Sequence, residues 1–513
     1  MPSPPKRTSA KAAAAPQPSA ESRLAGPDGT SATVVHLVAE LAPFARTGGL
    51  GEAAANLARF QAKAGLDVVI LMPFYREVAQ QAPALRVVEP PLVVQVQGRT
   101  EEVRLLELVS TEPGRQPRIY FLDRPAYFDR AGLYGEGGQD YADNARRYAC
   151  FCLAALQALP RLVDGPAVLH AHDWHAALAP VYLRTWYRAD PFYQRIAVVL
   201  AVHNAGFQGH FPVAAMHDLG LPWALYNFSQ LEWYGRVNLL KGAMAFADAV
   251  VTVSPTHAHE LRTAGGGFGL HEAFIGLGGR FVGITNGIDQ EVWNPAADPQ
   301  ITAPFSADAL DGKKRNKAAL QRLYGLPQRA RLPLFGMSAR MVAQKGLDLI
   351  LGSGFLSLEA QFVFLGAGEP RYEAALRQLA FRAPERIGVQ LNFTDRFEHR
   401  LVAGADLCLM PSQYEPCGLT QMRAQRYGSL PVGRGVGGIA DTVQDDITGF
   451  LFDEFEPAAL DRAISRALAR FGDQSAWAPR MSAAMKQDFG WERSAERYAQ
   501  VYQRAIEIAD SRR

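Results

Sequence analysis

The amino-acid sequence predicts an α/β protein built from two doubly wound domains that face each other across a cleft. Continuous apolar segments alternate with helical patterns, this alternation occurs in both halves of the chain, and polar side chains follow several apolar segments. Apolar runs without polar alternation are typical of parallel strands that helices cover on both faces. Ligands of such sheets bind outside the carboxyl ends of the strands, so we expect the functional residues there, in the cleft.

The composition is that of a globular chain with more than one domain. The chain has 513 residues, 48% of them hydrophobic and 20% charged, and its formal net charge is +2. At about 150 residues per domain, this length predicts two or three domains. The balanced charge argues against a nucleic-acid-binding protein, and no segment approaches the ~18 apolar residues of a membrane-spanning helix. Four cysteines without a C-x-x-C pair favour neither a disulfide framework nor a structural zinc site.

Residues 1–32 are rich in Ala, Pro, Ser and basic residues and show no hydrophobic period, so we expect a disordered tail. The tail lacks the continuous apolar stretch of a secretory signal. A transit peptide is an alternative because the segment is basic and contains serine, but Glu21 and Asp28 argue against it. We therefore expect a cytoplasmic protein, with a plastid location as the lesser alternative.

The first domain is expected over residues 33–290. A Gly-rich loop follows the first strand and opens a helix, and a longer helix is expected over 143–159. The predicted strands of this domain are 33–40, 66–73, 118–122, 167–172, 197–204 and 249–254.

The second domain is expected over residues 291–485, and its first part, 294–333, is polar and contains proline, as a linker would be. From about Trp491 the pattern is amphipathic, so residues 486–513 are expected to form a C-terminal helical segment. The predicted strands of the second domain are 334–338, 361–366, 388–393, 406–412 and 430–435.

The loop after the first strand carries Arg46, Gly48 and Gly49. Paired glycines at the start of a helix let backbone N–H groups approach an anion, and an arginine beside them would complete a phosphate site. A tight turn that needs positive φ explains the same glycines equally well.

Three histidines and one aspartate cluster at the end of the fourth strand, in HAHDWHAALAP (residues 170–180). His170 and His172 share one face of this strand, so a metal site is conceivable, but no carboxylate–histidine helical motif follows, and a polar site at the strand end fits better. Asp143 lies at the expected start of a helix, where an N-cap is the simpler explanation.

In the second domain, Arg340 and Lys345 lie five positions apart beyond a strand end. Two such cations can hold a diphosphate leaving group and stabilise its developing charge. Glu415 precedes a proline and so cannot lie inside a regular helix, which favours a carboxylate that points from a loop into the cleft. An anion loop, a cation pair and a carboxylate loop together indicate a nucleotide-sugar enzyme. The chain has no D-x-D triplet to hold a metal on the diphosphate, and the two cations could replace that metal.

On these residues the chain closely resembles the bacterial glycogen synthase and plant starch synthase family, which are retaining glucosyltransferases of two Rossmann-like domains (GT-B architecture). The resemblance covers nearly all of the chain except the tail, in the family's order. The matching segments are ARTGGLGE, HAHDWHAALAP, VHNAGFQGHFP, VSPTHAHEL, GITNGID, SARMVAQKGLDLI, PSQYEPCGLTQM and GGIADTV.

The resemblance implies transfer of glucose from ADP-glucose to the non-reducing end of an α-1,4-glucan such as glycogen, with retention at the anomeric carbon and no cofactor or metal. It places the acceptor side in the first domain and the donor side in the second. By this resemblance, Arg340 and Lys345 bind the donor diphosphate, Glu415 contacts the donor glucose, and His172 and Asp143 lie at the donor glucose and the acceptor side. Further donor contacts are implied for Arg46, Gly48, Gly49 and Asn286. Phe393 would face the base, and the distal phosphate would contact Thr420, Gly437 and Gly438.

The sequence departs from the family pattern at three positions. Arg46 stands where the family usually has Lys, Glu52 where Asp is common, and Val436 where Thr is usual. An arginine keeps the charge of lysine but is planar and bulkier, so these changes bear on donor affinity and nucleotide choice.

Two other functions remain open. Retaining transferases that use UDP- or GDP-sugars share the architecture, but they typically carry a second Glu where this chain has Arg423. A glucan-binding protein on a decayed enzyme scaffold is the alternative of a different class, which the retained residues argue against. A phosphorylase would need a pyridoxal-phosphate lysine, for which the sequence gives no sign. For the enzyme we expect a front-face route, because no carboxylate is placed as a covalent nucleophile.

Overall fold

The computed structural model describes residues 24–26, 29–96, 98–110 and 114–512. Most of the predicted tail therefore lies outside the described residues. Its last part is ordered, which corrects the expectation for residues 24–26 and 29–32: Leu24 is buried in the first domain, and Ala25 pairs with Ser31 in a β-bridge. The backbone N–H of Ala25 donates to Gln503 near the C-terminus, so this turn closes over the last helix.

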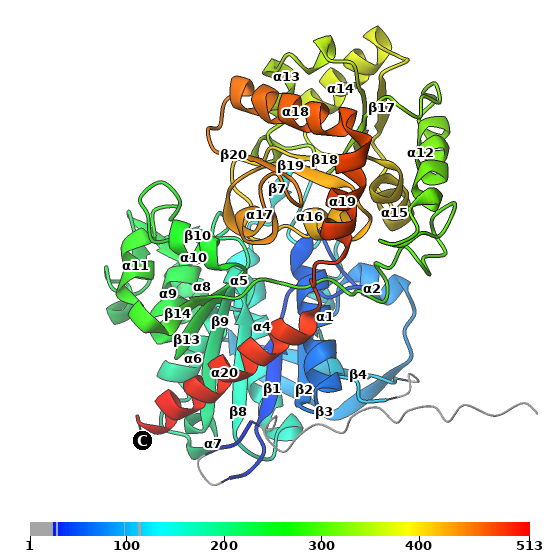
Figure 1. Ribbon diagram of the computed structural model, residues 1–513. Helices are drawn as coiled ribbons and strands as arrows, with labels where there is room; N and C mark the ends of the chain where they lie inside the picture. Colours follow the sequence, from blue (N-terminus) through cyan, green and yellow to red (C-terminus); the bar gives the residue numbers. More distant parts are fainter. Residues whose placement is uncertain (1–23, 27–28, 97, 111–113, 513) are drawn as a thin grey trace, which may run out of the picture.

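Two α/β domains form the molecule, one above the other in Figure 1, and each has its own sheet. Both sheets are covered by helices on their two faces, as the continuous apolar strands predict, and the predicted fold class is confirmed. No helix among the described residues is long and apolar enough to cross a lipid bilayer.

The sheet of the first domain has the strand order β14-β13-β9-β8-β1-β2-β5-β4-β3. Its strands are parallel except for β4 and β3, which add an antiparallel hairpin at one edge. The strands are β1 (Thr33–Leu37), β2 (Asp67–Pro73), β3 (Leu85–Val96), β4 (Arg99–Leu108), β5 (Arg118–Asp123), β8 (Ala167–His172), β9 (Ile196–Val202), β13 (Ala249–Thr252) and β14 (Phe281–Gly283).

Helices and two small sheets complete this domain. The helices are α1 (Gly49–Lys63), α2 (Arg76–Gln80), α3 (Pro125–Phe128), α4 (Asn144–Leu162), α5 (Asp173–Ala176), α6 (Leu178–Thr185), α7 (Pro191–Gln194), α8 (Ala215–Leu219), α9 (Leu239–Phe246), α10 (Pro255–Glu260) and α11 (His271–Gly276). The small sheets are β10 (His210–Pro212), β12 (Arg236–Asn238) and β11 (Glu232–Trp233), and β6 (Gly135–Glu136) with β7 (Gln139–Asp140).

The sheet of the second domain is entirely parallel, in the order β17-β16-β15-β18-β19-β20. Its strands are β15 (Leu334–Ser338), β16 (Gln361–Leu365), β17 (Ile387–Gln390), β18 (Leu407–Met410), β19 (Leu430–Arg434) and β20 (Phe450–Phe452). Its helices are α12 (Asp311–Leu323), α13 (Leu347–Gly352), α14 (Pro370–Arg382), α15 (Asp395–Gly404), α16 (Thr420–Arg426), α17 (Gly437–Thr442), α18 (Pro457–Gly472) and α19 (Gln474–Met485).

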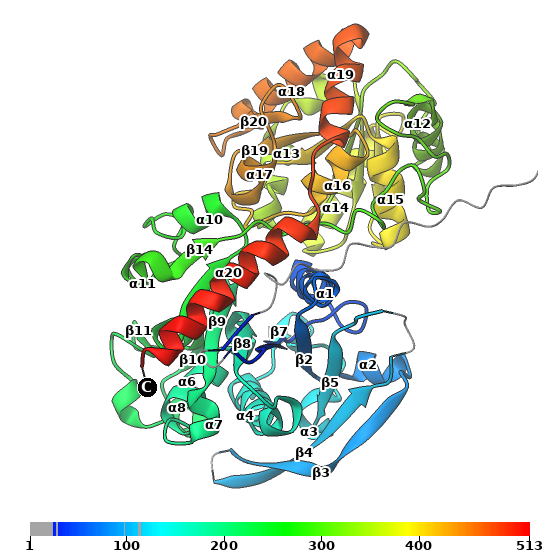
Figure 2. The same ribbon diagram turned by 60° about the horizontal axis from the view of Figure 1, so that its bottom comes forward.

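The sequence pattern missed two features. The β3–β4 hairpin, which Figure 2 shows at the outer edge of the first sheet, has only one buried face along much of its length. It therefore shows the polar alternation of a half-exposed strand instead of a continuous apolar run. The expected linker over 294–333 contains α12, which packs against α15 and so belongs to the second domain.

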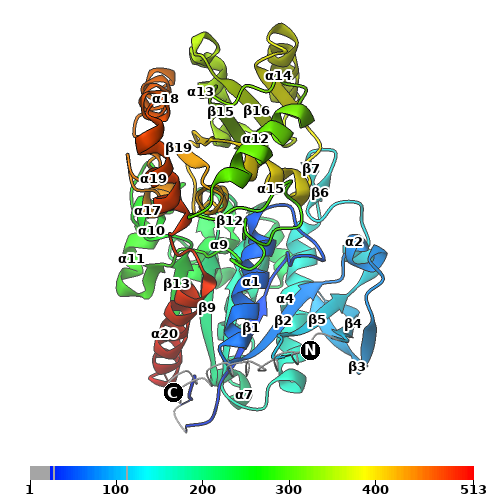
Figure 3. The same cartoon turned by 45° about the vertical axis from the view of Figure 1, so that its right-hand side comes forward.

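The last helix, α20 (Trp491–Asp510), crosses back from the second domain to the first (Figures 1 and 3). The amphipathic pattern predicts this helix correctly, because its buried residues recur every three or four positions. They include Trp491, Tyr498 and Tyr502, which join the core around β8, β9 and α1. The final segment is thus part of the first domain's core, and the chain connects the two domains twice.

Candidate active site

A cleft of about 1560 Å³ separates the two domains. Residues that follow the carboxyl ends of the central strands of both sheets line it, as expected for doubly wound sheets. The sequence-predicted residues that line the cleft are Arg46, Gly48, Gly49, Asn286, Arg340, Lys345, Phe393, Glu415 and Thr420. Four others, His172, Asp143, Gly437 and Gly438, are not among the lining residues.

The backbone N–H groups of the Gly-rich loop bind the carboxylate of Glu40. Glu40, at the end of β1, accepts hydrogen bonds from the backbone N–H of Thr47 (2.7 Å) and Gly48 (3.3 Å) and from the hydroxyl of Tyr134 (2.6 Å). Gly48 has φ −165°, an extended conformation that any residue adopts, so the expected positive-φ turn is wrong here. A Cβ at Gly48 or Gly49 would meet open space, so glycine keeps this wall of the cleft free for a ligand.

Arg46 spans the cleft instead of pointing into it. Its guanidinium donates to both carboxylate oxygens of Asp395, at the start of α15 in the opposite domain (2.7 and 2.8 Å). Both side chains are largely exposed, so this pair contributes about 1 kcal/mol or less and opens easily.

The two cations of the second domain differ in their surroundings. Lys345 donates to Oε2 of the buried Glu415 (2.5 Å), an oxygen that also accepts from the Ser412 hydroxyl (3.0 Å). Arg340 is exposed, and its guanidinium has no ion-pair partner among the residues that the structure describes. Gly346 has φ +75°, and a Cβ there would lie 2.0 Å from the Pro411 carbonyl oxygen, so only glycine lets the Lys345 turn pack against the strand end that carries Glu415.

Gly437 and Gly438 lie behind the Glu415 loop and are not among the residues that line the cleft, and their phosphate contact stays a prediction. A Cβ on Gly437 would meet the carbonyl oxygen of Glu415 at 1.9 Å, and one on Gly438 that of Cys417 at 2.0 Å. The Gly437 N–H donates to Glu260 of the first domain (2.9 Å). The glycine pair therefore serves close backbone packing between α17, the Glu415 loop and α10.

His172 and Asp143 likewise lie outside the lining of the cleft, and their expected contacts stay predictions. His172 is the last residue of β8 and is fully buried, with hydrogen bonds to His36 and His203. Asp143 is the N-cap residue of α4, as the simpler explanation predicts, but its side chain makes no capping bond and instead binds Arg130 (2.6 and 2.7 Å). Burial would raise the pKa of Asp143, and the hydrogen bonds from Arg130 outweigh it and hold the pKa below its ordinary value.

Sequence reasoning included Asp173 in the polar cluster at a strand end without giving it a role, and it missed His203. Both residues directly follow the ends of β8 and β9 and line the cleft. Asp173 has φ +55°, a strained conformation for a non-glycine residue, and its Oδ1 accepts the His203 N–H (2.7 Å). Burial raises the pKa of Asp173 to about 7, although the His203 and Asn204 N–H groups oppose the shift. Burial lowers the pKa of His203 to about 4, so its ring is neutral at physiological pH. The sequence signal that could have found them is their position, one residue beyond the ends of two central strands.

A buried arginine joins the domains at the back of the cleft. Arg423 on α16 pairs with both carboxylate oxygens of Glu52, on α1, and with Glu398 on α15 (2.9 Å), and its guanidinium lies 4.3 Å from the centre of the Trp293 ring. Burial disfavours the charge of Arg423, but the attraction of both carboxylates raises its pKa above the ordinary value. The position that carries a second Glu in related transferases thus forms an interdomain ion pair here.

Comparisons with known proteins match most of the chain. A family model described as starch synthase catalytic domain matches residues 33–275, and one described as glycosyl transferases group 1 matches 326–479. The chain is 42% identical to glycogen synthase 2 of Geobacter sulfurreducens, over 94% of this chain and 99% of the relative, and 41% identical to glycogen synthase of Syntrophotalea carbinolica, over 91% and 98%.

Two solved structures share the architecture. The catalytic domain of starch synthase IV from Arabidopsis thaliana, bound to ADP and acarbose, superposes with a TM-score of 0.84 at 32% identity and covers 93% of this chain and 100% of that chain. Sucrose-phosphate synthase from Thermosynechococcus elongatus superposes with a TM-score of 0.57 at 17% identity, over 92% and 98%, and shares the fold.

Asp173→Asn should stabilise the protein increasingly as pH rises. Between the usual carboxyl pKa of 3.8 and about 7, unfolded Asp173 loses its proton while folded Asp173 keeps it, so its contribution to stability is present below this window and is lost through it. Urea denaturation should show the variant's advantage growing over this range by no more than about 4 kcal/mol and staying constant above it. Parallel stability curves for the two proteins would contradict a protonated Asp173.

Arg423→Met should strongly destabilise the protein, because it leaves Glu52 and Glu398 without their cation. Removal of one partner of a buried ion pair costs about 3–5 kcal/mol. Lys314→Met is the matched control, since it breaks an exposed pair with Asp311 and should cost about 1 kcal/mol or less. Equal free energies of unfolding for the two variants would show that the Arg423 cluster does not hold the domains.

Proposed function

The chain belongs to the glycogen and starch synthase family of glycosyltransferases, and we propose that it transfers glucose from ADP-glucose to the non-reducing end of an α-1,4-glucan, with retention at the anomeric carbon. The observation that carries this proposal is the pairing of Lys345 with Glu415 at the ends of the central strands of the second domain, with Arg340 beside them in the cleft. The near full-length similarity to glycogen synthases supports the glucan acceptor, and the ADP in the starch synthase structure supports the nucleotide.

The donor diphosphate would lie among Arg340, Lys345 and Arg46. Arg340 is free to bind it directly, whereas Lys345 and Arg46 are paired with Glu415 and Asp395 in the empty cleft. Three cations that converge on one anion are sufficient to stabilise the charge that develops on the leaving group. Phe393, 43% exposed in the cleft, offers a ring face on which the base can stack.

The donor glucose would lie between Glu415 and the opposite wall. Oε2 of Glu415 is fixed by Lys345 and Ser412, while Oε1 has no hydrogen-bond partner among the described residues and is available to a sugar hydroxyl. His203 and Asp173 face the same cleft from the first domain. A sugar held from both domains favours the arrangement in which both walls of the cleft reach it, so donor binding and domain closure would be coupled.

The reaction would follow a front-face route. The bond between the anomeric carbon and the diphosphate oxygen breaks through an oxocarbenium-like transition state, and the acceptor 4-hydroxyl forms the new bond on the same face. The departing diphosphate oxygen takes the proton of this hydroxyl, and Arg340 and Lys345 stabilise the ADP that leaves. Asp173 is a poor nucleophile because burial raises its pKa and its Oδ1 already accepts the His203 N–H.

We further propose that no divalent metal and no cofactor take part, because Arg340 and Lys345 are placed where a metal would neutralise the diphosphate. UDP-glucose is the alternative donor. Phe393 does not decide between the two donors, since a stacking ring does not distinguish bases by hydrogen bonding. A cytoplasmic location stays a prediction from the sequence.

The direct test is glucose incorporation into glycogen from ADP-glucose and from UDP-glucose, in the presence of EDTA. We expect transfer from ADP-glucose that EDTA does not reduce. Transfer from UDP-glucose alone would confirm a glucosyltransferase and contradict ADP-glucose as the donor. Loss of transfer in EDTA would contradict the metal-free proposal. No transfer from either donor by the folded protein would refute the proposed enzyme activity.

Lys345→Ala should lower kcat by about 10²- to 10³-fold, because it removes one of the groups that stabilise the leaving group in the transition state. It should also cost stability, since Glu415 is left buried without its cation. Lys317→Ala is the matched control: Lys317 pairs with Asp406 in a buried bridge (2.6 Å) away from the cleft. The control should lose stability and keep the kcat of the folded protein, and an equal loss of kcat in both variants would contradict the role of Lys345.

A further inference from the structure

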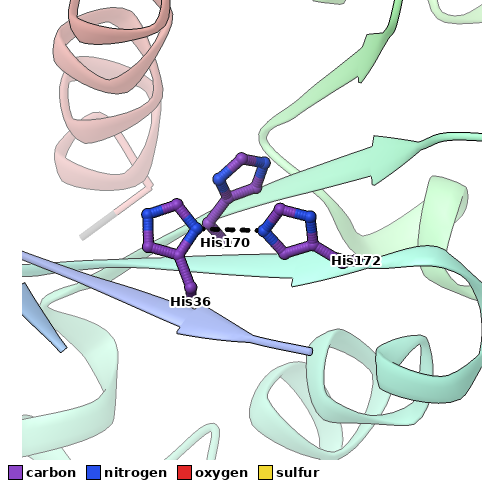
Figure 4. A group of neighbouring side chains, drawn as sticks. All are labelled: His36, His170 and His172. Carbon is purple, nitrogen blue, oxygen red and sulfur yellow. Dashed lines mark hydrogen bonds between the residues drawn. The ribbon is translucent and has the colours of Figure 1, made fainter. Parts of the chain in front are cut away.

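Three buried histidines gather beneath the cleft. His36 on β1 lies beside His170 on β8 in register, and His172 follows two residues later on the same face (Figure 4). The three rings are fully buried, with ligand atoms within 4.8 Å of one another. Burial lowers the pKa of each ring, to about 4 for His36, so all three are neutral at physiological pH.

Hydrogen bonds join these rings to the cleft on one side and to α20 on the other. On the cleft side, Nε2 of His203 lies 2.9 Å from Nδ1 of His172, and His203 lines the cleft. Nε2 of His172 lies 3.0 Å from Nδ1 of His36, and Nε2 of His36 lies 2.8 Å from Oε1 of Gln61 on α1. Gln61 in turn donates its amide N–H to the hydroxyl of Tyr502 on α20 (2.8 Å).

The direction of this chain follows from Gln61. Because its amide nitrogen donates to Tyr502, its oxygen faces His36 and can only accept, so the proton of the neutral His36 ring is on Nε2. Nδ1 of His36 is then an acceptor, which places the proton of His172 on Nε2. By the same reasoning Nδ1 of His172 accepts, and the proton of His203 is on Nε2.

We propose that Gln61, His36 and His172 are positioning residues that hold His203 in its Nε2–H tautomer, so that Nδ1 is a fixed hydrogen-bond acceptor for a hydroxyl of the glucosyl group. Nδ1 of His203 has no hydrogen-bond partner within the described part of the chain. Its use by a sugar rests on the proposed function, but the tautomer does not. A histidine without this restraint would interconvert between tautomers, and its Nδ1–H tautomer would present a donor to the same hydroxyl.

A metal ion is the competing occupant of the same cluster. Binding to all three rings needs a lone pair on Nε2 of His172 and on Nδ1 of His36 at once, which leaves no proton between them. The hydrogen bond between these two atoms and a tri-histidine metal site therefore exclude each other.

The tautomer is tested without substrate, by NMR of the protein with ¹⁵N-labelled histidine rings. We expect His36, His172 and His203 to show Nε2–H signals that do not change from about pH 6 to pH 8, because their pKa values lie far below this range. Loss of single signals in His→Asn variants assigns them, and His259→Asn, at an exposed position, is the control that leaves all three in place. An Nδ1–H form or a mixture at His203, or loss of the His172 proton on addition of Zn²⁺, would overturn the proposal.

Kinetics test the use of the acceptor. In His203→Asn the side-chain oxygen can occupy the place of Nδ1, whereas in His203→Gln the amide can reach only the place of Nε2. We expect the Asn variant to keep at least tenfold more kcat/KM than the Gln variant, at equal thermal stability. Equal kcat/KM values for the two variants would overturn the acceptor role. Absence of activity in the unsubstituted protein would refute the proposed function and leave the NMR result intact.

Gln61→Met tests the anchor of the chain, because it removes the acceptor at similar volume. We expect a mixture of tautomers at His203 and a fall in kcat/KM that is smaller than in His203→Gln, because part of the protein keeps Nδ1 as an acceptor. An unchanged His203 signal in the folded variant would overturn the role of Gln61.

Discussion

Opposite charges that meet across the cleft are the constraint on which the rest of the site depends. Arg423 joins Glu52 to Glu398 behind the cleft, and on the other side Thr256 donates to Asp441 (2.7 Å). These contacts set the spacing of two domains that must hold one ligand between them. α20 adds a covalent reason for the same spacing, because it returns to the core of the first domain.

Three of the anion-binding elements of the cleft hold a carboxylate of the protein itself: Glu40 lies in the Gly-rich loop, Asp395 pairs with Arg46, and Glu415 pairs with Lys345. Donor binding is therefore an exchange of anions, and the exposed pair of Arg46 is the easier of the two ion pairs to exchange. These carboxylates keep Arg46, Lys345 and the Gly-rich loop oriented, so the fold itself organises this part of the cleft.

The sequence predicted both parallel sheets and the main charged residues of the second domain, because apolar strands and the polar ends that follow them are local signals. It could not predict which of two consecutive residues at a strand end faces the cleft. At the end of β8 the strand keeps His172 in the core, and the positive φ of Asp173 directs the next side chain to the cleft. Likewise, only the tertiary packing shows that Gly437 lets the backbone of α17 approach the Glu415 loop closely.

The central claim is that cations of the cleft, and not a metal, bind the donor through its diphosphate. Calorimetric titration of the protein with ADP and with adenosine, both in EDTA, tests it most directly. We expect ADP to bind at least tenfold more tightly than adenosine, and the difference to shrink as salt is added. Equal affinities for ADP and adenosine would contradict it.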